Sequence, residues 1–167
     1  MNIVQVTADI LSWVENFVEK PHPALGNWPP CPYARAARLR GTVAVYLGSD
    51  PYFDLKNLSK HGLGRREVVI YAYDPAEWGF ELFHSSLEQA NTDLLLSRDL
   101  IVLEDHPGDP EIVNGVCMNQ GQYALAMCQS LSDLNIRAKQ MADKSFYHGW
   151  PEEYLQGLFR HRQDPRS

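Results

Sequence analysis

The chain has 167 residues, of which 44% are hydrophobic and 22% are charged, so it is long enough for one domain with a core and shows no compositional sign of extended disorder. Fifteen Lys and Arg stand against twenty-one Asp and Glu, and the resulting formal charge of −6 opposes binding to nucleic acid phosphates. No stretch approaches the ~20 apolar residues that cross a bilayer, and the first twenty residues lack the pattern of a secretory signal.

The first half of the chain predicts a helix, a loop, and two strands on either side of a short helix. Apolar residues recur at helical spacing in residues 7–20, which predicts an amphipathic helix. Prolines in residues 21–32 cannot continue that helix, so an ordered, extended loop follows. Residues 41–47 and 67–73 are rich in β-branched and apolar side chains and are predicted strands, with a helix over 54–61 between them.

The second half predicts three helices and two strands. Asp74, Pro75 and Glu77 are residue types that open a helix, and we expect this helix to run to about Leu95. After it we expect a strand over residues 100–103 and an irregular loop over 104–110. Residues 123–128 are expected to form another strand, although they could instead begin the next helix. That helix, capped by Ser130, is expected over 131–141, and a last helix over 151–160.

These elements predict an α+β fold. We expect one domain over residues 1–167, with a mixed four-stranded sheet and helices mainly on one face in a ferredoxin-like arrangement. An α/β doubly wound sheet is the alternative. The first arrangement is preferred because the predicted helices are too few to cover two faces well.

A candidate reactive cysteine lies in the proline-rich loop. Pro32 suits the first turn of a short, alanine-rich helix, which would place Cys31 at its N-cap. The helix dipole, with Arg35 and Arg38 nearby, would then lower the pKa of the thiol. Cys31 is therefore a candidate nucleophile, expected to react faster with thiol reagents than the other two cysteines.

The surroundings of Cys31 suggest a ligand as well as a competing interpretation. Arg35 and Arg38 could bind an anionic group, and Trp28 and Tyr33 could contact the same ligand. Alternatively, Cys31 is a buried, inert side chain beside those two rings, and the arginines belong to a solvated surface.

A second candidate site follows the predicted strand over 100–103. Asp105 and His106 lie there with two further acidic residues, and His106 could be an acid, a base or a metal ligand. Asn119 could orient a small ligand by amide hydrogen bonds. Acidic residues in a loop with Pro and Gly are more often turn formers and caps. We expect this loop and Cys31 to lie on the same side of the sheet.

The N-terminal quarter of the chain resembles known sequences. The stretch HPALGNWPPCPYARAA, followed by VAVYLG, is similar to the opening of short, uncharacterised bacterial proteins with a Cys-Pro-aromatic motif after a Pro and Gly loop. The resemblance brings no established activity and implies only that Cys31 is worth testing. It rests on Trp13, Gly26, Cys31, Pro32 and Tyr33.

Three classes of function follow from these sites. The first is a small enzyme acting on an anionic small metabolite, with Cys31 as thiolate, His106 as acid or base, and Arg35 or Arg38 as the cation that binds substrate. The second is a non-catalytic domain that binds a small ligand or a partner protein. The third is a metal or haem protein with Cys31 and a histidine as ligands.

The remaining cysteines and histidines add little. Cys117 and Cys128 lie among apolar residues and are interpreted as small hydrophobic side chains. The histidines lack the spacing of known metal motifs, so the sequence defines neither a metal site nor a cofactor. The cysteine pattern fits a reducing compartment, and we expect a soluble, cytoplasmic protein without membrane or nucleic acid partners. A homo-oligomer is compatible with the sequence.

Overall fold

The computed structural model describes residues 1–167 and contains six α-helices and six strands. The helices are α1 (Ile3–Trp13), α2 (Ala34–Arg40), α3 (Pro51–His61), α4 (Phe80–Ala90), α5 (Leu131–Ala142) and α6 (Glu152–Leu158). The strands are β1 (Val43–Leu47), β2 (Val68–Tyr73), β3 (Leu100–Asp105), β4 (Ile112–Val113), β5 (Val116–Cys117) and β6 (Ala124–Ser130). Short π- or 3-10-helical turns are η1 (Val14–Val18), η2 (Pro23–Leu25), η3 (Asn91–Leu95) and η4 (Leu96–Arg98). None of the helices combines the length and the apolar character needed to cross a lipid bilayer.

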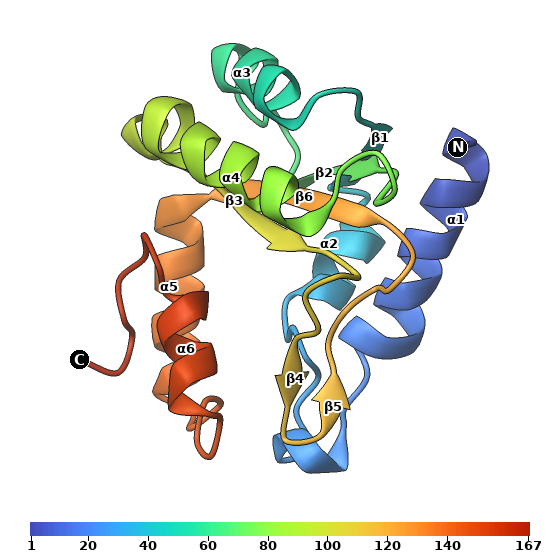
Figure 1. The fold of residues 1–167 in the computed structure, drawn as a ribbon. Helices are drawn as coiled ribbons and strands as arrows, with labels where there is room; N and C mark the ends of the chain where they lie inside the picture. Colours follow the sequence, from blue (N-terminus) through green and yellow to red (C-terminus); the bar gives the residue numbers. More distant parts are fainter.

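Four of the strands form one mixed sheet in the order β1-β2-β6-β3. β1 and β2 are parallel, and β6 runs antiparallel to both of its neighbours, β2 and β3. The expected α+β fold with a mixed four-stranded sheet is therefore confirmed. β4 and β5 form a separate hairpin that projects from the sheet (Figure 1).

Helices cover both faces of this sheet, which is a more even distribution than the sequence suggested. α3 and α4 lie on one face, and α1, α2, α5 and α6 lie on the other side (Figure 1). On the first face, Leu55 of α3 and Phe83 of α4 are fully buried against strand residues in a cluster that we call the main cluster. On the second face, Val6 and Ile10 of α1 pack on Ile70 of β2. Burial of these side chains is the main source of stability of the sheet.

A third group of buried side chains lies away from the sheet and holds the C-terminal part of the chain. We call it the C-terminal cluster. It brings together aliphatic side chains of η2, the β4–β5 hairpin, α5 and α6 and several aromatic rings, two of which, Phe146 and Tyr147, pack edge-to-face with ring centroids 4.9 Å apart. Its buried members are Leu25, Val113, Ala138, Phe146, Tyr147, Trp150, Leu155 and Phe159.

The ends of the helices show which local signals were interpreted correctly. Ser130 caps α5 as expected, because its hydroxyl oxygen accepts a hydrogen bond from the backbone N–H of Asp133 at 3.2 Å. The helix expected from Asp74 is wrong at its start. Asp74 caps only a turn, accepting from the N–H of Ala76 at 2.8 Å, and α4 begins at Phe80. The extended backbone of Gly79 separates the turn from the helix.

Candidate functional site

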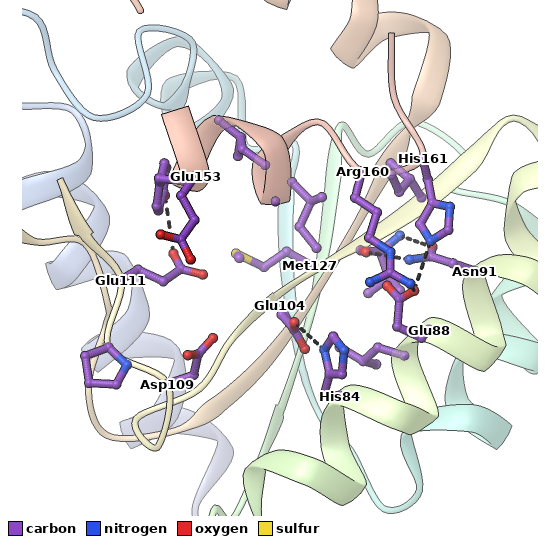
Figure 2. A pocket seen from close by; sticks show the side chains of 18 of the residues that line it. His84, Glu88, Asn91, Glu104, Asp109, Glu111, Met127, Glu153, Arg160 and His161 are labelled. Atoms are coloured by element: carbon purple, nitrogen blue, oxygen red, sulfur yellow. Dashed lines mark hydrogen bonds and ion pairs between the residues drawn. The ribbon is translucent and has the colours of Figure 1, made fainter. Parts of the chain in front are cut away.

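A cleft of about 650 Å³ lies around the free edge of β3. β3 is the outer strand of the sheet, and Ile101–Glu104 line the cleft along its edge. α4 forms one wall and α6 the other (Figure 2). The floor is apolar and includes Met127 of β6. The side chain of Asn91 protects this edge, since it accepts from the N–H of Val102 at 2.9 Å and donates to its carbonyl at 3.1 Å.

Three carboxyl groups gather at one end of the cleft. Asp109, Glu111 and Glu153 line it, and none of them forms an ion pair. Burial raises the pKa of Glu111 to about 7, with a further contribution from the nearby negative charges, including Asp109. The hydroxyl of Tyr154 on α6 lies 3.5 Å from Oε2 of Glu111 (Figure 2). A carboxyl group with this pKa can take up or release a proton at neutral pH.

A histidine–carboxylate pair lies near the middle of the cleft. Nδ1 of His84 on α4 lies 2.7 Å from Oε1 of Glu104 on β3 (Figure 2). The other carboxylate oxygen of Glu104 is buried and has no hydrogen-bond partner. Burial raises the pKa of Glu104, whereas the hydrogen bond with His84 lowers it. The pair thus places a hydrogen-bonded carboxyl group and imidazole ring in the cleft.

Ion pairs close the opposite end of the cleft. Oε2 of Glu88 lies 2.9 Å from a guanidinium nitrogen of Arg160 and 3.0 Å from Nε2 of His161. Glu88 belongs to α4, and its two partners directly follow α6 (Figure 2). The cleft therefore has one end whose carboxyl groups lack an ion-pair partner and another in which the carboxylate of Glu88 is compensated by the guanidinium group of Arg160.

The predicted residues Asp105 and Asn119 lie behind the cleft and shape its acidic loop. Asp105 is buried, and its carboxylate accepts from the N–H of Gln120 and from Nδ2 of Asn119, both at 2.8 Å. Burial raises the pKa of Asp105 and these hydrogen bonds oppose that effect. Oδ1 of Asn119 accepts from the N–H of Glu111 at 2.7 Å. Both residues thus fix the backbone that carries Glu111.

His106, the predicted acid or base, is held by the backbone on both sides of its ring. Nδ1 accepts from the N–H of Gly108 at 2.9 Å, so Nε2 carries the proton that it donates to the carbonyl of Trp78 at 2.8 Å. The residue is only 5% exposed, and its ring packs against Phe80 and Phe83. The arrangement locks the acidic loop to α4 and leaves neither nitrogen free for a ligand in this conformation.

Cys31 differs from the expectation in its position and in its pKa. The N-cap of α2 is Tyr33, two residues further on, so Cys31 does not cap the helix. Burial raises the pKa of the Cys31 thiol, although neighbouring backbone N–H groups and the charges of Arg137 and Arg162 oppose the shift. The expectation of a lowered pKa is therefore wrong, because removal of the thiol from water outweighs the positive charges nearby.

The other residues predicted around Cys31 are mostly engaged elsewhere. Arg38 forms two hydrogen bonds with Glu19, at 2.9 and 2.7 Å, while Arg35 is exposed. The hydroxyl of Tyr33 donates to Gln140 at 2.8 Å, and the ring of Trp28 packs edge-on against Phe146. No hydrogen bond, ion pair or ring contact joins Cys31 to His106, and the interactions of the two side chains involve different residues.

Sequence reasoning missed most of the cleft. The acidic segment singled out beyond β3 contains Glu104 and Asp109, which do line it. No sequence pattern marked His84, Glu111 or His161 as site residues. Glu111 lies only two positions after Asp109, so a slightly longer acidic segment would have included it. No group of three or more His, Cys, Asp or Glu side chains is arranged to hold a metal ion.

Comparisons with family models, with curated proteins and with solved structures found no match to this chain. The resemblance to proteins with a Cys-Pro-aromatic motif therefore stays an expectation.

Proposed function

We propose that the cleft binds a small organic cation, such as an amine with an aliphatic stem, and that Glu111 exchanges a proton with it as general acid or base. The observation that carries this proposal is the position of Glu111. Its carboxyl group lies in the wall of a cleft, and burial together with neighbouring carboxylates brings its pKa to about 7.

The charge of the cleft favours a cation over an anion. Asp109, Glu111 and Glu153 have no cationic partner, so a positively charged group placed between them gains Coulomb energy that an anion would lose. The apolar side chains of Ile101, Leu103 and other floor residues suit a hydrocarbon stem. A ligand with a charged end and an apolar stem matches both features.

The earlier hypothesis of an anionic metabolite at Cys31 has weaker support. Arg38 is neutralised by Glu19, and burial raises the pKa of the thiol. It stays a prediction, as does a purely binding role without chemistry. Cation binding and proton exchange are separate roles of the cleft. Binding depends on all three carboxyl groups of the acidic end, whereas proton exchange depends on Glu111 alone.

The proposal is tested by titrating the protein with 1,4-diaminobutane at low salt while backbone amide signals are followed by NMR. Succinate serves as the anionic probe. We expect the diamine to shift amides in residues 104–111 and 153–161, and to bind more tightly at pH 8 than at pH 6 because Glu111 is then ionised. Succinate is expected to bind at least tenfold more weakly.

Two variants make the test specific. Glu111→Gln removes the proposed group and should weaken diamine binding at pH 8 by roughly threefold to tenfold and abolish most of its pH dependence. Glu77→Gln removes the same charge from an exposed turn outside the cleft and should leave binding unchanged. Equal binding of both probes, or equal effects of both variants, would show that the acidic end does not select the ligand.

A further inference from the structure

The two walls of the cleft belong to different parts of the core. α4 packs into the main cluster through Phe83 and Leu87. α6 packs into the C-terminal cluster through Leu155, and Phe159, the residue that follows α6, belongs to the same cluster. Because the cleft lies between α4 and α6 (Figure 2), its width depends on how these two elements are held together.

A single side chain of α4 makes the polar contacts across this end of the cleft. Among the hydrogen bonds and ion pairs, those that join α4 to residues 143–167 all involve Glu88, which contacts Arg160 and His161. Arg160 is largely exposed, whereas the side chains of Glu88 and His161 are three-quarters buried or more. None of these three residues belongs to the main cluster or to the C-terminal cluster.

The backbone at the contact is also strained. His161 has φ +63°, in the left-handed region that glycine adopts most easily, so its conformation costs about 1 kcal/mol. Its contact with Glu88 helps to hold it there. Before α6, in the segment that follows α5, Ser145 and Gly149 also have positive φ, at +63° and +79°. Irregular backbone thus lies on both sides of α6.

We propose that α6 and the turn at Arg160–His161 form a movable wall of the cleft, and that Glu88 is the latch that holds this wall against α4. Loss of the latch lets α6 swing or fray away from α4, which opens the cleft to a ligand. The inference deepens the proposed function, because it assigns a regulation to the same cleft. The movement itself can be measured without any ligand.

The test is amide hydrogen exchange of the full chain, followed by mass spectrometry, in Glu88→Gln and in Arg160→Gln. We expect amides of residues 152–161 to exchange roughly threefold to tenfold faster in Glu88→Gln and about twofold faster in Arg160→Gln. Exchange in the sheet and in α3 should stay as in the unmodified protein. Raising the salt concentration to screen the ion pairs should accelerate exchange of the same residues in the unmodified protein.

The matched control is Asp143→Asn, which removes an ion pair with Lys139 that is exposed on both sides and lies outside the cleft. It should leave α6 unchanged. Unaltered exchange of residues 152–161 in both latch variants would overturn the proposal, and so would an acceleration of equal size throughout the chain. Either failure would leave the role of Glu111 untouched, because its test depends on diamine binding and not on exchange.

Discussion

Oδ1 of Asn119 accepts a hydrogen bond from the backbone N–H of Glu111, 2.7 Å away. The other end of the same amide donates to the buried carboxylate of Asp105 and to the carbonyls of His106 and Asp109. One side chain therefore ties together four residues of the acidic loop. This places Glu111 at the cleft wall, although Asn119 itself lies behind it.

The first prediction concerns that amide. Asn119→Ala should lower the free energy of unfolding by about 2–4 kcal/mol, since it leaves buried polar groups of the loop without partners. Asn119→Asp should be at least as damaging at pH 8, because it places a second negative charge against Asp105. Urea unfolding measures both. Gln122→Ala, which removes only an exposed hydrogen bond, is the control. If all three variants change the free energy of unfolding by the same small amount, Asn119 does not hold the loop together.

This loop shows how far the sequence could lead. The polar segment beyond β3 was recognisable, because Pro and Gly residues demand irregular backbone and the acidic residues cluster there. The roles within it were not recognisable. Asp105 and His106 are adjacent to Glu104 in sequence, yet their side chains make bonds behind the cleft while Glu104 lines it. Contacts from residues distant in the sequence, namely Trp78, Asn119 and Gln120, decide this, and such contacts leave no local pattern.

The cleft as a whole was beyond local reasoning for the same reason. Its walls come from α4, the acidic loop and α6, which are far apart in the chain. The strands and most helices follow from hydrophobic spacing and caps, and these were predicted well. The placement of β6 between β2 and β3 and the separate C-terminal cluster depend on long-range packing. A single sequence carries little information about such packing.

The second prediction uses the raised pKa of Glu111. Between the ordinary pKa of 4.5 and about 7, the folded protein keeps a proton on Glu111 that the unfolded chain has released. The free energy of unfolding should therefore fall as pH rises through this window. Glu111→Gln cannot lose that proton, so it should gain stability relative to the unmodified protein by about 3 kcal/mol between pH 4 and pH 8.

Urea unfolding at several pH values checks this prediction. Glu77→Gln, an exposed residue with the same change, should follow the unmodified protein at every pH. If Glu111→Gln also follows it, the carboxyl group titrates in its ordinary range and cannot act as an acid or base at neutral pH.

The third prediction concerns Gly48, directly after β1. A Cβ atom at this position would lie 2.0 Å from Cε1 of Tyr73, and the ring of Tyr73 is fixed by burial and by a hydrogen bond from its hydroxyl to Asp54 at 3.0 Å. Gly48→Ala should therefore cost about 3 kcal/mol or more, or prevent folding. Gly157→Ala in α6 meets no atom within 4 Å and should be neutral or slightly stabilising. Melting temperatures of the two variants give the comparison, and a well-folded Gly48→Ala with unchanged stability would mean that Tyr73 can move.

The last prediction reverses the order of cysteine reactivity expected from the sequence. Cys117, taken from the sequence as a small hydrophobic residue, is exposed on the β4–β5 hairpin. Cys128 is fully buried in the main cluster, and burial raises its pKa to about 12. Cys31 is half-buried, with a pKa that burial also raises. Thiolate content and access together control alkylation, so Cys117 should react first, Cys31 more slowly, and Cys128 only on unfolding.

Partial alkylation with iodoacetamide at pH 7.5, followed by peptide mass spectrometry, gives the order directly. The same reaction in concentrated urea should label the three thiols at similar rates, because unfolding removes the differences in burial. Cys117→Ser should leave the slow rate of Cys31 unchanged, which separates intrinsic reactivity from competition for reagent. If Cys31 is labelled first in the folded protein, its thiolate is stabilised more strongly than its burial allows. That result would favour the hypothesis that Cys31 is a nucleophile over the function proposed for the cleft.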